Sequence, residues 1–315
     1  MDTDDALAFS HYARRVLAAH PEWRVELDRT VDAPFDWVAA RTAVRTIVDG
    51  PDASSRLGPA LRALRARLFV HTLARDLTGR AALDEVCGAV TTLAEVAIDA
   101  AVTSSRRDLV ATHGEPIGED SGAPQPFVVV GMGKLGGSEL NVSSDVDLVY
   151  LFPEDGDTTG PRSIANREFF DRVARRVSVA LSDTTSDGFV FRVDLRLRPY
   201  GESGPVTLPF SALESYLVTQ GRTWERYAWL KARPLTGVPD ATLDAIVAPF
   251  VFRKYLDYDA YAGLRDVHRQ IREQAGRRDA RDDVKLGPGG IREIEFIVQA
   301  LQIVRGGRDP ALRVR

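Results

Sequence analysis

The chain has 315 residues, 27% charged and 44% hydrophobic, with 45 acidic against 41 Lys and Arg side chains and a net charge of −4. This length fits two compact units or one large one, and the ordinary composition excludes a disordered or fibrous protein. The charge balance argues against a protein that coats nucleic acid. Cys87 is the single cysteine, which excludes a disulfide framework or a thiolate metal cluster and indicates a reducing compartment.

The sequence offers no evident targeting signal. No stretch approaches the ~20 apolar residues that a membrane span requires. The acidic start, with Asp2, Asp4 and Asp5, is the opposite of the positive region that opens a signal peptide. We therefore expect a cytoplasmic protein whose partners include neither a membrane nor a nucleic acid.

Residues 1–115 predict a helical leading segment. Apolar side chains recur there at intervals of three and four, the spacing of one helix face. They are Leu61, Leu64 and Leu68 in one stretch, and Leu83, Val86, Val90, Leu93, Val96 and Ala97 in another. Residues 113–126 are rich in Gly, Pro and acidic side chains, which predicts a loop and a domain boundary.

Residues 116–210 predict a catalytic core built on three strands of one sheet. Residues 127–131 form a β-branched run that ends in glycine, typical of a buried strand. Residues 145–152 alternate as a second strand, and 169–181 have helical spacing. A third strand is predicted over 189–197, after Gly188. Its polar face carries Arg192, Asp194, Arg196 and Arg198.

Residues 211–315 predict a helical extension. Helices are expected over 213–220, 224–231 and 243–255. A short strand over 283–286 and a glycine turn precede a last helix, and this strand and helix are expected to complete the catalytic domain. The apolar stripe of that helix is Ile291, Ile294, Ile297, Val298, Leu301 and Val304. The expected fold class is α+β.

Three aspartates are candidate metal ligands. Asp145 and Asp147, two apart on a strand, project to one face and can share a hard divalent cation. Their repulsion requires a cation or an arginine nearby. An isolated Asp-x-Asp pair is also compatible with a solvated edge. Asp194 supplies a third carboxylate from another strand.

A glycine-rich turn between the first two strands is a candidate phosphate site. It runs from Gly131 to Ser138 and includes Lys134 and Gly137. Glycines let backbone N–H groups approach phosphate oxygens, and Ser138 can add a hydroxyl. The turn lacks the P-loop pattern, because Leu135 follows Lys134, and it is also compatible with a simple tight turn. Together with three aspartates, it forms a layout suited to phosphoryl transfer.

These motifs resemble those of known families. Gly137-Ser138, Asp145-Val146-Asp147 and Asp194 resemble the nucleotidyltransferase superfamily of the DNA polymerase β type. Four longer blocks resemble, in order, the family of bifunctional glutamine synthetase adenylyltransferase/adenylyl-removing enzymes. The blocks are 130–148, 192–199, 224–233 and 285–296. The resemblance covers about residues 127–310.

The resemblance implies a polymerase-β-like sheet and specific roles in it. Asp145, Asp147 and Asp194 would be catalytic and hold Mg²⁺, with Gly137 and Ser138 on phosphate. Further candidates for nucleotide or phosphate contact are Lys134, Arg196 and Arg198, although either arginine can instead pair with Asp194. For Glu225, Glu293 and Glu295 a structural role is favoured over a chemical one.

The resemblance also implies an activity and partners. The sequences of residues 139–144 and 290–296 are similar to those of the amino-terminal, adenylyl-removing half of the family. The end at Arg315 suggests a fragment or a truncated gene product. The expected reaction is Mg²⁺-dependent removal of AMP from the adenylylated tyrosine of glutamine synthetase by phosphate, releasing ADP, in the control of nitrogen assimilation. The expected partners are glutamine synthetase, ADP or ATP, phosphate and a PII-type signal protein. The alternatives are ATP-dependent adenylylation of the synthetase and a non-catalytic regulatory nucleotide-binding module.

Overall fold

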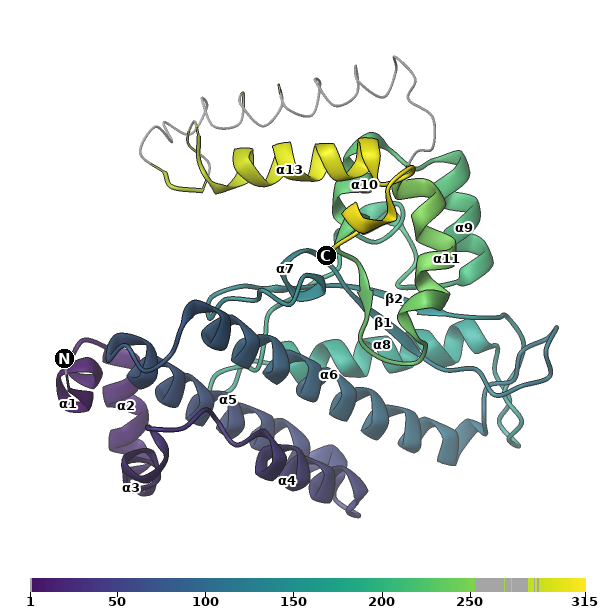
Figure 1. Ribbon diagram of the computed structural model, residues 1–315. Coiled ribbons are helices and arrows are strands. Elements are labelled where there is room, and N and C mark those ends of the chain that lie inside the picture. Colours follow the sequence, from purple (N-terminus) through teal and green to yellow (C-terminus); the bar gives the residue numbers. More distant parts are fainter. Residues whose placement is uncertain (1, 253–268, 270–272, 274–282, 286, 288) are drawn as a thin grey trace. The chain divides into compact units, whose positions relative to one another are not determined.

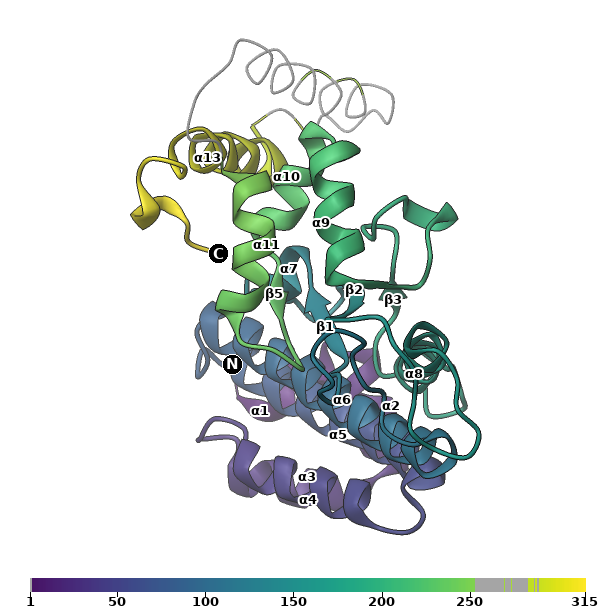
Figure 2. The ribbon, with the colours of Figure 1, turned by 90° about the vertical axis from the view of Figure 1, so that its right-hand side faces the viewer.

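The computed structural model describes residues 2–252, 269, 273, 283–285, 287 and 289–315 (Figures 1 and 2). The chain divides into two compact units. The first unit is Met1–Pro209 with Leu235–Gly237, and the second is Phe210–Pro234 with Val238–Arg315. The leading helices and the first four strands of the sheet therefore belong to one unit.

The first unit begins with six helices, as the apolar spacing predicted. They are α1 (Thr3–Ala8), α2 (His11–Ala19), α3 (Pro21–Thr30), α4 (Trp37–Asp49), α5 (Ala53–Leu77) and α6 (Leu83–His113). Asp2, Ser10 and Asp36 cap α1, α2 and α4 by accepting a backbone N–H group, which satisfies a donor that the first turn leaves free.

Helix α6 is the central helix of this unit and packs against α4, α5 and α8. By length and composition it is apolar enough to cross a membrane, so the expectation that no stretch approaches such a span is wrong. Of its most apolar window, 67% is buried inside the protein, as in the core helix of a globular protein. The helix stops at Gly114, whose φ of +81° and lack of a Cβ allow contact with Gly160.

The sheet lies beside these helices (Figure 2). Strand β1 (Val128–Gly131) runs antiparallel to β2 (Val146–Phe152). Strand β3 (Val193–Asp194) pairs in parallel with the start of β2, and β4 (Thr207–Pro209) pairs in parallel with its end. Helix α8 (Asn166–Ser182) connects β2 to β3. On the far side of β1, the Leu235 N–H group donates to the Val129 carbonyl at 2.7 Å.

Two predicted strands differ from the structure. The third strand, expected over 189–197, spans only Val193–Asp194. Val190 and Phe191 before it do not join the sheet, because their N–H groups donate to the Leu181 carbonyl at the end of α8. The strand expected over 283–286 is a turn in its described residues, since the Asp283 carboxylate accepts the Lys285 N–H group at 2.8 Å. Residue 286 lies outside the described residues.

An aromatic cluster joins β1 and β2 to α8. Phe170 stacks on Phe152 and Phe127, with ring centroids 4.9 and 5.8 Å apart, and meets Phe169 edge to face. All four side chains are at most 2% exposed. The cluster fixes β2 against α8 and therefore fixes the start of the connection to β3.

The second unit is helical. Among its described residues are α9 (Phe210–Thr219), α10 (Thr223–Leu230), β5 (Arg233–Pro234), α11 (Asp240–Val251), α13 (Ile291–Arg305) and a short 3-10 helix (Pro310–Leu312). This confirms the helices predicted over 213–220, 224–231 and 291–304. Of the helix predicted over 243–255, the last three residues lie outside the described residues. Most of the apolar stripe predicted on α13 is more than half exposed: Ile291, Ile294, Ile297, Val298 and Leu301.

Three glutamates of the second unit form hydrogen bonds or an ion pair with neighbouring residues. Glu225 is 3% exposed, and its carboxylate accepts hydrogen bonds from the Tyr216 hydroxyl and the Arg222 N–H group, both at 2.7 Å. Glu293 accepts the Gly289 N–H group at 2.8 Å. Lys231 pairs with Glu295 at 3.3 Å. These contacts agree with the structural role that the sequence favoured.

Truncating the aromatic cluster should destabilise the first unit. Phe170→Ala removes a fully buried ring and should lower the free energy of unfolding by about 3–5 kcal/mol. Val179→Ala, on the same helix but 61% exposed, should change it by less than about 0.5 kcal/mol. Denaturant unfolding followed by circular dichroism measures both. Equal losses in the two variants would contradict the packing described here.

Candidate active site

Two of the three candidate aspartates are direct neighbours in the sheet. In the parallel pairing of β2 and β3, Asp147 is the register partner of Asp194. Residues paired in this way project to the same face, with their side chains a few ångströms apart. The Asp194 side chain is only 15% exposed. The fold thus places two carboxylates side by side at a partly buried position, as the sequence predicted.

Arg196 neutralises Asp194. Its backbone N–H donates to Asp194 Oδ1 at 2.8 Å, and its Nε donates to Oδ1 and Oδ2 at 3.0 and 2.8 Å. Its Nη2 also donates to Oδ2. These hydrogen bonds hold the pKa of Asp194 below its usual range, and the Asp147 charge contributes to raising the pKa of Arg196. A cation therefore already lies within reach of both carboxylates.

Asp145 has a different partner. It lies just before β2, and Arg192 Nε donates to its Oδ1 at 2.5 Å, while Arg192 Nη2 donates to the Ser143 carbonyl at 3.2 Å. Across the part of the chain that the structure describes, no group of three or more His, Cys, Asp or Glu side chains is arranged to hold a metal ion. The structure thus brings Asp147 and Asp194 together and turns Asp145 toward Arg192.

The glycine turn packs against Asp147. It forms a short helix, α7 (Gly133–Gly136), after β1, and the Met132 N–H group donates to the Asp147 carbonyl at 2.9 Å. Gly133 has a φ of +52°, and a Cβ built there would lie 3.3 Å from Asp147 Oδ2. A side chain at position 133 would therefore crowd the Asp147 carboxylate.

Gly137 and Ser138 close the turn. Their N–H groups donate to the carbonyls of Gly133 and Leu135 at 3.0 and 3.2 Å, so these donors are already used within the turn. Ser138 has a φ of +58°, uncommon for a residue other than glycine, and is exposed. The Ser138 residue is thus exposed, whereas the Gly137 and Ser138 N–H groups are engaged within the turn.

The two remaining candidates for phosphate contact, Lys134 and Arg198, have different surroundings. Lys134 is half-buried and lies within electrostatic range of Cys87 on α6. Burial raises the pKa of the Cys87 thiol, and the Lys134 charge lowers it to a lesser extent. Arg198 donates to the carbonyls of Leu195, Glu202 and Gly204 at 2.9–3.4 Å. Its guanidinium holds the turn after β3 together, in contrast to that of Arg196, which contacts the Asp194 carboxylate.

The pair is suited to magnesium. Mg²⁺ in proteins is usually held by one or two carboxylates, with phosphate oxygens and water completing an octahedron. Asp147 and Asp194 supply two carboxylates on one face. The side chain of Arg196 is 70% exposed, so the cation that now neutralises Asp194 is free to be displaced. Asp147 and Asp194 therefore fit the metal that the resemblance implies, and Asp145, the third expected ligand, contacts Arg192.

Two residues of this site were not identified from the sequence. Gly133 lies against Asp147, and Arg192 holds Asp145. The Gly-x-Gly pattern is the only signal that marks Gly133. Nothing local marks Arg192 as the partner of Asp145, because that contact depends on how β3 docks beside β2.

A carboxylate pair beside a glycine turn is a layout suited to phosphoryl transfer. Residues 2–245 match the family model of glutamate-ammonia ligase adenylyltransferase, and the chain belongs to this family. It is 51% identical to a bifunctional glutamine synthetase adenylyltransferase/adenylyl-removing enzyme from Chromobacterium violaceum, and 48% and 47% identical to those from Nitrosomonas europaea and Bordetella pertussis.

These alignments cover 98% of this chain but only 34–35% of each relative. The chain thus spans about a third of the length of the curated relatives it matches. Residues 265–314 also match the family model of GlnD PII-uridylyltransferase.

The contact between Arg196 and Asp194 predicts a change in titration. Replacing Arg196 with glutamine should raise the pKa of Asp194 toward its ordinary value, because the hydrogen bonds that favour the carboxylate are lost. Arg192→Gln removes the partner of Asp145 instead and should leave the pKa of Asp194 unchanged. Carboxyl-carbon NMR titration of both variants measures these shifts.

The sign of the pH effect follows. A carboxylate whose pKa is lower in the folded state stabilises that state above its unfolded pKa, and the contribution disappears as the pH falls through the folded pKa. The folded pKa of Asp194 is expected to be lower in the wild type than in Arg196→Gln. As the pH falls, the wild type should therefore keep the stabilising contribution of Asp194 to a lower pH than the variant does. An Asp194 that titrates identically in the wild type and in Arg196→Gln would contradict the contact.

Proposed function

We propose that this chain is an Mg²⁺-dependent nucleotidyltransferase that removes AMP from the adenylylated tyrosine of glutamine synthetase by phosphorolysis, releasing ADP. The observation that carries the proposal is the in-register pair Asp147 and Asp194 beside the Gly133 turn. The substrate is inferred from the names of the relatives, which act on glutamine synthetase. The direction is inferred from the resemblance of residues 139–144 and 290–296 to the adenylyl-removing half of the family.

The proposed reaction exchanges one phosphorus–oxygen bond for another. An oxygen of inorganic phosphate attacks the phosphorus of the tyrosine-bound AMP, and the bond from that phosphorus to the tyrosine oxygen breaks. ADP is formed, and the tyrosinate takes a proton from water. Because tyrosine has a pKa of ~10, its anion can leave without a protein acid. When bound, Mg²⁺ supplies positive charge to the phosphoryl oxygens.

The residues of the chain position the reactants in this proposal. Asp147 and Asp194 hold the cation, and Gly133 leaves room for it beside Asp147. Arg196, which contacts Asp194, would turn its guanidinium toward the phosphate oxygens once the cation displaces it. The planar donors of arginine suit this change of partner, since they match a carboxylate and a phosphate equally well. Ser138 adds its exposed hydroxyl to a phosphate oxygen.

The carboxylate pair can be tested by activity. With adenylylated glutamine synthetase, Mg²⁺ and phosphate, the wild type should release ADP. Asp147→Asn and Asp194→Asn should each lower the rate by at least about 100-fold, because weakening a metal ligand removes several kcal/mol of transition-state stabilisation. Asp120→Asn, an exposed position away from both strands, should retain the wild-type rate.

Three outcomes would contradict the proposal. Absence of ADP from the wild type would reject phosphorolysis. Transfer of label from radiolabelled ATP onto the unmodified synthetase, without ADP release, would assign the opposite direction. Undiminished release by both aspartate variants would reject the site.

The glycine turn can be tested by a matched pair of substitutions. Gly133 and Gly122 both have a positive φ, but a Cβ meets Asp147 only at Gly133 and nothing within 4 Å at Gly122. Gly133→Ala and Gly122→Ala should therefore lose similar stability, on the order of 1 kcal/mol. Only Gly133→Ala should also lower ADP release and raise the Mg²⁺ concentration required for it. An equal loss of activity in both variants would contradict a role for Gly133 beside the metal.

A further inference from the structure

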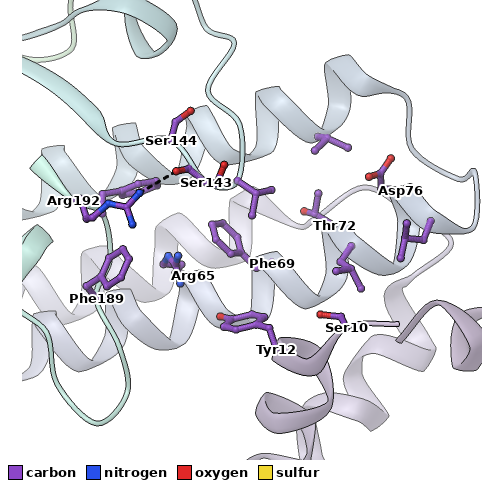
Figure 3. Close-up of a pocket in the computed structure, with 15 residues that line it drawn as sticks. Ser10, Tyr12, Arg65, Phe69, Thr72, Asp76, Ser143, Ser144, Phe189 and Arg192 are labelled. Atoms are coloured by element: carbon purple, nitrogen blue, oxygen red, sulfur yellow. Dashed lines mark hydrogen bonds between the residues drawn. The ribbon is translucent and has the colours of Figure 1, made fainter. Parts of the chain in front are cut away.

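A cavity of about 540 Å³ lies inside the first unit, next to Ser143 and Ser144 (Figure 3). Its walls come from α2, α5, α6, the loop before β2 and residues 189–192. The proposed reaction uses none of the cavity residues. The volume is within the range of pockets that hold small molecules, about 300–1,000 Å³.

The cavity has an apolar body and one cationic region. Phe69, Leu73, Val86 and Val142 are among the side chains of its apolar wall. Arg65 and Arg192 lie together near Phe189, away from Asp76 (Figure 3). The guanidinium of each arginine lies over the Phe189 ring, at 4.9 and 5.7 Å from its centroid. A ligand that fills this space meets apolar surface along its length and positive charge at one end.

Arg65 is held without an acidic partner. Its guanidinium lies 4.2 Å from the Phe69 ring centroid and 4.9 Å from that of Phe189. Its Nε atom is buried and has no hydrogen-bond acceptor, and no carboxylate forms an ion pair with it, within the described residues. Burial lowers the pKa of Arg65, and the charge of Arg192 lowers it further, whereas Tyr12 raises it through its charge and a side-chain hydrogen bond to Arg65. Arg65 is thus a half-buried cation whose buried Nε lacks an acceptor, and an anion that completes its hydrogen bonds would stabilise it.

We propose that this cavity binds a small organic carboxylate, with its carboxylate on Arg65 and Arg192 and its aromatic or aliphatic body along the apolar wall. Two guanidinium groups suit a planar carboxylate, which accepts paired hydrogen bonds from arginine. The apolar wall disfavours inorganic phosphate, which has no apolar part to bury and would lose its hydration.

The site is linked to Asp145. Arg192 lines the cavity, and the same guanidinium donates to Asp145 at 2.5 Å. A ligand carboxylate and Asp145 therefore compete for Arg192. Binding in the cavity weakens the hold on Asp145, and by reciprocity removing the Asp145 charge strengthens binding in the cavity.

The probe for this proposal is 4-phenylbutyrate, titrated into the full chain by isothermal titration calorimetry. We expect binding at probe concentrations of about 1 mM or below. Arg65→Gln and Arg192→Gln should each weaken binding at least about tenfold through loss of a charge-assisted hydrogen bond. Arg45→Gln, whose side chain is 79% exposed on α4, is the matched control and should bind as the wild type does. Asp145→Asn should bind the probe several times more tightly.

Neutral and inorganic competitors define the ligand class. 4-Phenylbutanol should bind at least about tenfold more weakly than the carboxylate, and inorganic phosphate at the same concentration should not displace it. The proposal is overturned if the probe does not bind, if the alcohol binds equally well, or if phosphate displaces it. Unchanged binding in the more exposed Arg192→Gln variant, with its fold verified by circular dichroism, also overturns it. These measurements read binding alone, so they do not depend on the proposed reaction.

Discussion

The parallel pairing of β2 with β3 is the interaction on which the candidate site depends. It comprises two register partners, Val146 with Val193 and Asp147 with Asp194. Moving β3 by one residue would turn Asp194 to the opposite face and separate the carboxylates. The pairing is short, so its precision comes from its surroundings, in which α8 packs through Phe170 and the Val190 and Phe191 N–H groups are bound to the end of that helix.

Electrostatics explains why so many arginines lie near this pairing. Two carboxylates side by side repel each other, and the folded chain needs positive charge there whether or not a metal is bound. Arg196 forms an ion pair with Asp194, and Arg192 forms one with Asp145. Both arginines are mostly exposed, so neither pair is a rigid buried salt bridge. Exposed pairs contribute little to stability, which suits the proposed replacement of Arg196 by a metal at Asp194.

The sequence predicted the parts of this site better than their arrangement. Local alternation identified β2 and placed Asp147 on it, and the glycine turn was recognised from its composition. The length of β3 was overestimated, because alternation continues through residues that bond to α8 or form a turn. The contact of Arg192 with Asp145 and the stacking of Arg65 on Phe189 join segments far apart in the chain. Such contacts follow from tertiary packing, which no local pattern encodes.

The most direct test of the account is to locate a divalent cation. A crystal of the chain soaked with Mn²⁺ and ADP should show an anomalous difference peak coordinated by carboxylate oxygens of both Asp147 and Asp194, with Arg196 moved from Asp194 toward the phosphates. A peak bound elsewhere, or an Arg196 that stays on Asp194 while the nucleotide is bound, would contradict the account.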